Sequence, residues 1–268
     1  MQQIGSTLQA TLERIRRNLK NPGTRHSGSL TDKSSSAEHE CPVCQDREFV
    51  LEQNLDSSWR AIPCKCREQK AIKRMLKASG LTAEQRAVRL KDFKPSPKTM
   101  AMYRQVKRYL DEFPQIYESD AVNKGLALTG TVGIGKTMLV TAIANELLDR
   151  MIPTAFVVTP DLIAELRAAQ FTDGGQDLER KIYKLSTVQV CIFDDVAKEK
   201  PSEWVQTQYF RIIDARYRAK LPTIFTSNYN FDQIAERLGD AVSSRLYALT
   251  KGRQIDVQAD DYRIVGGR

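Results

Sequence analysis

The sequence has no run of about 18 consecutive apolar residues, the length that a membrane-spanning helix requires. Its first 20 residues contain no continuous apolar stretch, so we expect no secretory signal, no membrane association and a cytoplasmic location. Cysteine is scarce, at 5 residues in 268, and four of the five lie between positions 41 and 66. Cysteines so few and so clustered argue against a disulfide-stabilised scaffold, and in a reducing compartment they indicate a metal site.

The N-terminal part has few acidic residues for its many basic ones. Residues 1–100 hold 19 Lys and Arg against 11 Asp and Glu, whereas residues 101–268 hold 22 of each, so the whole net charge of +8 lies in the first part. This asymmetry favours an acidic partner, nucleic acid or an acidic protein face, although a well-solvated surface also explains it. The remaining composition, 41% hydrophobic and 28% charged, is that of a soluble globular protein with one large and one small domain.

The first 38 residues predict a helix followed by a linker. An amphipathic helix is expected over residues 1–20, and it is too short to be stable alone, so it should dock on its own domain or on a partner. Residues 21–38 are rich in Gly, Pro and Ser and predict a flexible linker. The apolar stripe of the helix consists of Ile4, Leu8, Leu12, Ile15 and Leu19.

Two further segments complete the predicted domain organisation. Residues 39–80 form a small cysteine-bearing module that ends in a basic helix over 67–79, and residues 81–268 form the main domain, which includes a helix over 99–113. From Gly125 on, short apolar runs alternate with helical stretches, which predicts an α/β fold with a parallel sheet covered on both faces. The chain stops about ten residues after the last run, so we expect no C-terminal helical lid. The expected strands are Leu126–Thr129, Ala155–Thr159, Val188–Phe193, Thr223–Thr226 and Arg253–Val257, and the expected helices are 136–150, 160–170, 176–185, 202–219 and 231–247.

Residues 130–137 read GTVGIGKT and match the phosphate-loop pattern G-x-x-x-x-G-K-[ST] in full. A predicted strand precedes the motif and an apolar helix follows it, which argues against a chance match. Backbone N–H groups at Gly130, Gly133 and Gly135 are expected to surround phosphate oxygens at the helix N-terminus. Lys136 then faces the β- and γ-phosphates and the Thr137 hydroxyl binds magnesium, which predicts an ATP site.

The buried strand VCIFDD ends in two carboxylates, about 58 residues after the phosphate loop, and resembles a Walker B strand. Asp194 is expected to hold magnesium and Asp195 to polarise the attacking water, although a strand-end Asp pair also caps turns. Asp195 is one methylene shorter than Glu, which leaves its reach to that water open. Asn228, at the end of the next strand, is expected to orient the water, or to start a turn.

An arginine late in the sequence is a candidate for action between subunits. Arg245 follows the helical segment LGDAVSS and lies far along the chain from the phosphate loop. It is expected to reach the nucleotide of a neighbouring subunit and to stabilise charge on the γ-phosphate. The alternative is an ordinary surface ion pair.

Four cysteines have the spacing of a zinc site, C-x2-C followed by C-x-C. The segment around them has too few apolar residues for a core of its own, so bound metal would supply the missing folding energy. His39 is an alternative to one thiolate, four free thiols are the alternative to a site, and Cys191 is interpreted as a small buried apolar residue. The expected ligands are Cys41, Cys44, Cys64 and Cys66.

Five segments together resemble the DnaC/DnaI/IstB group of AAA+ ATPases, which contains bacterial and phage helicase loaders and transposition helper ATPases. These segments are GTVGIGKT, VCIFDDVAKEKPSEWV, LPTIFTSNYN, LGDAVSSRL and DDYR, and the resemblance covers roughly residues 41–265. The fold it implies is an AAA+ P-loop NTPase with a five-stranded parallel sheet. The cysteine module favours the loader branch.

The resemblance also implies a function. A member of the loader branch binds a replicative DNA helicase, here through residues 39–80, holds single-stranded DNA, and hydrolyses ATP slowly between the subunits of a homo-oligomeric spiral. The implied DNA contacts are Phe171, Ser202 and Trp204, with a position in the core as the alternative for each aromatic. Arg263 is expected to replace in part the arginine of a missing lid, the alternative being that no residue replaces it. An IstB-like transposition helper, and a zinc-bearing DNA-binding adaptor with negligible turnover, remain as alternatives.

Overall fold

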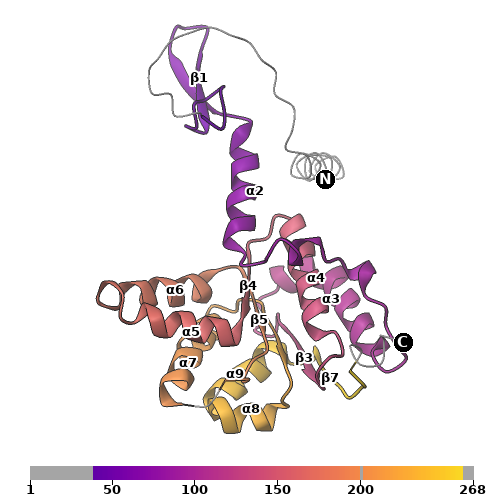
Figure 1. Cartoon of the computed structure of the whole chain (residues 1–268). Coiled ribbons are helices and arrows are strands. Elements are labelled where there is room, and N and C mark those ends of the chain that lie inside the picture. The colour runs from indigo at the N-terminus through magenta and orange to yellow at the C-terminus, as the bar shows by residue number, and fades with distance from the viewer. Residues whose placement is uncertain (1–38, 200–201, 262–268) are drawn as a thin grey trace. The chain divides into compact units, whose positions relative to one another are not determined.

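The computed structural model describes residues 39–199 and 202–261 (Figure 1). The helix predicted over 1–20, the linker over 21–38 and Arg263 lie outside the described residues. The chain divides into two compact units, Met1–Met75 and Leu76–Arg268, and the domain limits given above remain predictions. Within the described residues, no helix is long and apolar enough to cross a membrane.

The first unit contains a β-hairpin that the sequence reasoning missed. Strands β1 (Phe49–Gln53) and β2 (Trp59–Pro63) pair antiparallel, with Phe49 opposite Pro63. Most of their side chains are exposed, so the sequence of the hairpin lacks the apolar alternation that predicts strands. Val50 is one of the few side chains that are partly buried, and it packs against the cysteines. Helix α2 (Cys66–Ala78) follows and confirms the predicted basic helix to within one residue. The division between the two units falls within α2.

The second unit is built on a five-stranded parallel sheet, as predicted. The strand order is β4-β5-β6-β3-β7. All five residues of β3, β5 and β6 are buried, which is why these strands show no regular alternation of apolar and polar residues. The strands are β3 (Leu126–Gly130), β4 (Thr154–Val158), β5 (Val190–Asp194), β6 (Thr223–Ser227) and β7 (Gln254–Val257).

Helices cover both faces of this sheet. Figure 1 shows α3 and α4 together on the opposite side of the sheet from α7, α8 and α9. One core cluster joins apolar side chains of α5 to α9 to those of β5 and β6. The α-helices are α3 (Met100–Glu118), α4 (Lys136–Asp149), α5 (Thr159–Ala169), α6 (Gln176–Thr187), α7 (Glu203–Arg218), α8 (Phe231–Leu238) and α9 (Asp240–Thr250). Short 3-10 turns, η1 (Gln85–Ala87), η2 (Leu90–Asp92) and η3 (Asp173–Gly175), lie in the connections.

Two predicted helix limits were wrong for identifiable reasons. The single helix expected over 231–247 is two helices, because Gly239 adopts φ 91° and ψ 151° between them. Helix α3 runs to Glu118 rather than ending at Phe113, although Pro114 lies inside it. Proline cannot donate to the carbonyl four residues earlier, and here the Arg150 guanidinium donates to that Leu110 carbonyl at 2.7 Å. A tertiary contact therefore repairs the helix that the local sequence would have ended.

Candidate nucleotide site and cysteine cluster

The phosphate loop has the conformation that its glycines permit. It connects the end of β3 to the first residue of α4, and Gly133 and Gly135 adopt left-handed φ angles of 78° and 89°. A Cβ at Gly135 would lie 2.5 Å from a ring carbon of Phe93, so the position has no room for a side chain. The backbone cradle that a phosphate group needs is thus present at the N-terminus of α4.

Lys136 joins the ends of two strands. Its ammonium group is buried and donates to the Gly130 carbonyl at 2.8 Å, to the Thr131 carbonyl at 2.7 Å and to Asn228 Oδ1 at 2.8 Å. The structure therefore brings Asn228, the predicted water-orienting residue, into direct contact with the predicted phosphate-binding lysine.

Asp194 is the buried carboxylate of the site. Its Oδ1 accepts hydrogen bonds from Thr137 Oγ1 at 3.1 Å and from Thr226 Oγ1 at 2.6 Å. Burial raises the pKa of Asp194 above its usual value, against the lowering effect of these two hydroxyls and of the Lys136 charge. A carboxylate and a hydroxyl oxygen in contact are hard ligands of the kind magnesium prefers, so this pair fits the predicted ion.

The strand that carries Asp194 is not next to the phosphate-loop strand, because β6 lies between β5 and β3. The order of strands in a sheet is set by crossover connections and leaves no local trace in the sequence. Thr226 on β6, which the sequence reasoning did not single out, spans this gap by binding Asp194 and by accepting from the Asp195 N–H at 2.9 Å. The available signal was a hydroxyl residue, Thr226, near the end of a fully buried strand.

Asp195 begins the loop after β5 in an unusual conformation. Its φ angle of 60° is left-handed, and its carbonyl accepts from Thr159 Oγ1 at 2.7 Å. Its carboxylate forms an ion pair with Lys198 Nζ at 2.8 Å. The backbone of the candidate base is thus fixed from both sides, while its carboxylate has a cationic neighbour.

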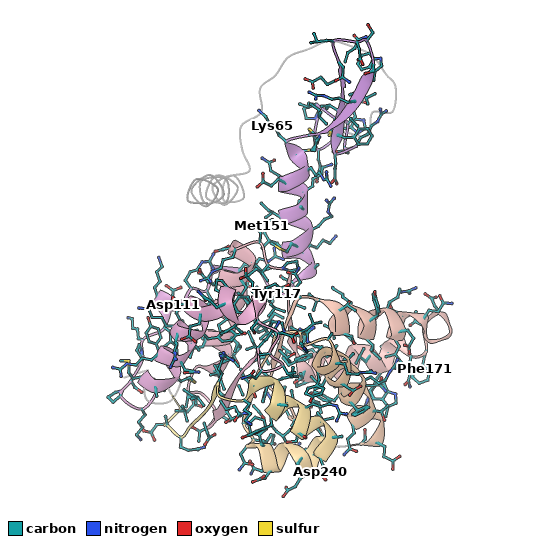
Figure 2. The ribbon with its side chains drawn as sticks, turned by 180° about the vertical axis from the view of Figure 1, so that it is seen from behind. Lys65, Asp111, Tyr117, Met151, Phe171 and Asp240 are labelled. Atoms are coloured by element: carbon teal, nitrogen blue, oxygen red, sulfur yellow. The ribbon has the colours of Figure 1, made fainter. Side chains whose placement is uncertain are left out.

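The three predicted DNA contacts lie in different environments. Phe171 follows α5 and is 83% exposed, at the outer end of that region in Figure 2. Ser202 caps α7, since its hydroxyl accepts from the Val205 N–H at 3.3 Å. Trp204 is partly buried against the core cluster, with the guanidinium carbon of Arg167 at 5.6 Å from its ring centroid. The predicted roles of these residues in binding DNA remain predictions.

Arg245 lies on α9 and is bound within its own chain. Its Nε donates to Asp214 Oδ1 at 2.7 Å, and its guanidinium carbon lies 4.8 Å from the ring centroid of Phe210. Asp214 also forms an ion pair with Arg218 at 2.9 Å. The ion-pair alternative therefore describes this conformation, and action on a neighbouring subunit remains a prediction.

The four predicted zinc ligands converge. Their sulfur atoms all lie within 4.8 Å of one another, with Cys41 Sγ 3.8 Å from Cys64 Sγ and Cys44 Sγ 3.3 Å from Cys66 Sγ. Tetrahedral zinc with Zn–S bonds of about 2.3 Å separates its sulfurs by about 3.8 Å, so the cluster has the right size for the ion. The Cys44 backbone N–H lowers the pKa of Cys41 to about 7, whereas burial raises the pKa of Cys66.

The environment of the cluster favours four thiolates over a histidine ligand. His39 lies outside the cluster, with its Nδ1 3.5 Å from Asp46 Oδ2. Asp46 accepts from the Cys41 N–H at 3.0 Å and pairs with Lys70, and this lysine lowers the pKa of Asp46 to about 2. Cys191 is fully buried in β5, as interpreted from the sequence.

Comparison with known proteins decides the family. The sequence model of the family described as "IstB-like ATP binding protein" matches residues 46–264. The chain belongs to this family. Together with the loaders described next, this match confirms the DnaC/DnaI/IstB resemblance, and the sheet confirms the AAA+ fold.

Several relatives of this IstB-like chain are known. The phage-like element PBSX protein XkdC of Bacillus subtilis is 27% identical over 88% of this chain and 90% of its own length. The replicative helicase loader DnaI of Bacillus subtilis is 31% identical over 52% of this chain but only 42% of its own length. The replicative helicase loader DnaC of Escherichia coli K12 is 26% identical over 52% of this chain and 54% of its own length. The match therefore spans about half of each loader.

Solved structures give the same fold. A crystal structure of DnaI superposes with a TM-score of 0.55 at 26% identity, over 66% of this chain and 95% of that one. The DnaC helicase loader superposes with a TM-score of 0.55 at 24% identity, over 67% of this chain and all of that one.

Proposed function

We propose that this IstB-like protein is a slow ATPase that acts as a helicase loader in DNA replication. It binds ATP with magnesium, single-stranded DNA and a replicative helicase, and it hydrolyses ATP between the subunits of a homo-oligomer in the cytoplasm. The observation that carries this proposal is the contact of Lys136 with Asn228, 2.8 Å apart, beside the Asp194–Thr137 pair. Phosphoryl transfer to water requires a lysine that faces the phosphates, a group that orients the water and oxygen ligands for magnesium. These three parts lie together here.

Each residue of the site has a proposed role. The backbone of Gly130, Gly133 and Gly135 holds the phosphates, and Lys136 leaves its carbonyl partners to face the β- and γ-phosphates. Thr137 and Asp194 hold magnesium, which neutralises charge on the phosphates when bound. Asp195 takes the proton of the attacking water, and Asn228 orients that water. Arg245 of a neighbouring subunit completes the site.

The loader assignment rests on the relatives and on the cysteine cluster. Two relatives, DnaI and DnaC, carry the name of replicative helicase loader. We assign zinc to the four cysteines and the helicase contact to the module at 39–80, which lies in the basic part of the chain. Single-stranded DNA is assigned to the ATPase domain, with Phe171, Ser202 and Trp204 as contacts.

Two other functions have an observation in their favour. An IstB-like helper of transposition is supported by the family match and by 33% identity over 119 residues to the insertion sequence IS5376 putative ATP-binding protein of Geobacillus stearothermophilus. A DNA-binding adaptor that scarcely turns ATP over is supported by the ion pair between Asp195 and Lys198. Preference for single- over double-stranded DNA separates the loader from the helper, and turnover in the presence of DNA tests the adaptor.

The decisive experiment combines nucleotide binding, turnover and helicase capture in four proteins. Wild type should bind ATP, hydrolyse it and retain a replicative helicase in a pull-down. Lys136→Ala should lose nucleotide binding, and Asp195→Asn should keep binding but lose most turnover. Lys107→Ala, an exposed lysine on α3, is the matched control. Unchanged ATP affinity in Lys136→Ala refutes the ATP site, and absence of helicase from the pull-down refutes the loader.

A further inference from the structure

Arg237 on α8 binds the loop that begins with Asp195. Its guanidinium group donates to three successive backbone carbonyls of this loop, those of Ala197, Lys198 and Glu199, the last at 2.7 Å. All three acceptors are main-chain atoms outside any helix or strand, so no regular secondary structure holds this segment. A planar guanidinium with several fixed donors is suited to gathering such carbonyls.

The loop has a backbone that needs external support. Asp195 and Ala197 both adopt left-handed φ angles, 60° and 66°, which are unfavourable for residues with a Cβ. On the β6 side, the Val196 N–H donates to the Thr226 carbonyl at 2.8 Å, and Ser227 Oγ donates to the Val196 carbonyl at 2.7 Å. Arg237 supplies the support further along the loop.

Arg237 also contacts the segment that follows Asn228. Its guanidinium carbon lies 4.5 Å from the ring centroid of Tyr229, the residue directly after Asn228, and such a contact is a cation–π interaction. One side chain therefore links the loop that carries Asp195 to the strand end that carries Asn228. These are the two residues assigned to the attacking water.

We propose that Arg237 is a positioning residue for ATP hydrolysis, which holds the loop after β5 so that the Asp195 carboxylate stays in register with Asn228. The inference rests on the proposed function, because it takes Asp195 as the base. Arg237 does not touch nucleotide in this scheme. It acts on the rate through the conformation of Asp195, whereas Lys136 and Asp194 act on binding.

The test compares Arg237→Met, which keeps the aliphatic stem but removes every donor, with Arg237→Lys, which keeps the charge without the fork. Arg237→Met should lower kcat by about tenfold or more, with KM and ATP affinity within about twofold of wild type. Arg237→Lys should recover part of that loss. Glu236→Gln, on the exposed neighbouring position of α8, is the control and should match wild type.

A double-mutant cycle separates positioning from general structural damage. If Arg237 acts through Asp195, Arg237→Met should cost nothing further in an Asp195→Asn background. The proposal is overturned if Arg237→Met lowers kcat by the same factor in the Asp195→Asn background, or if it lowers ATP affinity together with the melting temperature. It is also overturned if the kcat of Arg237→Met equals that of wild type.

A wild type without turnover would refute the proposed function rather than the loop contact. Hydrogen exchange then gives the independent reading, because the Val196 amide is protected by its bond to Thr226. Its exchange should be faster in Arg237→Met than in Glu236→Gln. Equal exchange in the two variants shows that Arg237 does not hold the loop.

Discussion

The carboxylate of Asp261 lies against the Cα of Gly133 in the phosphate loop. A Cβ placed at Gly133 would be 1.9 Å from Asp261 Oδ1 and 2.4 Å from Oδ2. The segment between β7 and Asp261 is fixed there by Thr131, whose hydroxyl donates to the Ala259 carbonyl at 2.6 Å and accepts from the Ala259 N–H at 3.0 Å. A negative charge therefore lies beside a loop whose N–H groups are arranged to attract anions.

Removing this charge should strengthen nucleotide binding. Asp261→Asn is expected to bind ADP and ATP about three- to tenfold more tightly, because like charges about 4 Å apart repel by about 1 kcal/mol even at the dielectric constant of bulk water. Titration with a fluorescent ADP analogue measures the change. Asp260→Asn is the matched control, since Asp260 faces Lys98 at 3.0 Å. Weaker binding in Asp261→Asn would mean that the carboxylate helps to hold the nucleotide or its magnesium.

The buried carboxylate of Asp194 should cost the nucleotide-free protein stability. Because its pKa is raised in the folded state, the folded protein holds that proton more tightly than the unfolded chain does, and ionisation lowers the free energy of unfolding. The penalty is complete above the raised pKa and disappears as the pH falls towards the ordinary carboxyl value. Asp194→Asn should therefore melt higher than wild type near pH 8, and the difference should shrink as the pH falls towards the ordinary Asp pKa of about 3.9. A difference in melting temperature that does not change with pH would mean that the substitution acts through packing rather than through ionisation of Asp194.

The parts that the sequence predicts are those with a local cause. The phosphate loop needs glycines where φ is positive, the central strands need apolar residues on both faces, and four thiols in two close pairs have the spacing of a metal site. Each requirement involves residues close together in the chain. The structure brings Lys136 to Asn228, Asp194 to Thr137 and the four cysteine sulfurs to within 4.8 Å of one another, while the roles of these residues remain predictions.

The parts that the sequence did not predict depend on contacts between distant residues. The position of β6 between β3 and β5, and with it the role of Thr226, follows from the path of the crossover connections. Arg150 continues α3 past Pro114, and Arg216 donates to the carbonyls of Leu185, Val188 and Pro222 from a fully buried position. No spacing rule identifies an arginine whose partners are main-chain carbonyls of other segments.

The cysteine cluster should bind one zinc ion per chain. Metal analysis after gel filtration should find zinc in wild type and lose it in Cys41→Ser and in Cys64→Ser, because each removes one of four ligands. Cys191→Ala is the matched control: burial raises the pKa of this thiol to about 11, so it offers no thiolate, and its zinc content should equal that of wild type. Metal-free wild type in which residues 39–66 remain folded would contradict the assignment.

The two predicted stacking aromatics should behave differently. Phe171 is exposed, so Phe171→Ala should leave the melting temperature unchanged and weaken single-stranded DNA binding by about 1–3 kcal/mol. Trp204 packs against the core cluster, so Trp204→Ala should cost about 2–3 kcal/mol of stability. Binding should weaken as salt rises, because phosphate contacts release counterions. Nucleotide-independent DNA binding that survives both substitutions would place the DNA site in the basic N-terminal part.

Arg245 should be needed for turnover but not for ATP binding. Asp214 holds its guanidinium group within the same chain, so the group must exchange that partner for a γ-phosphate of a neighbouring subunit. Arg245→Ala should therefore lower turnover at least about tenfold, while ATP affinity stays unchanged. Arg218→Ala is the matched control, because Arg218 binds the same Asp214 carboxylate but carries no proposed role.

Mixing two inactive variants tests whether Arg245 acts between subunits. Lys136→Ala subunits bind no nucleotide but supply the arginine, and Arg245→Ala subunits bind nucleotide but lack it. Where the two meet in the correct order a complete site forms, so the mixture should regain part of the turnover that neither variant has alone. Wild-type specific activity should also rise with protein concentration and with added single-stranded DNA, since both promote assembly. If wild type is a strict monomer whose turnover does not depend on protein concentration, and Arg245→Ala has the same turnover, Arg245 has no role beyond its ion pair with Asp214.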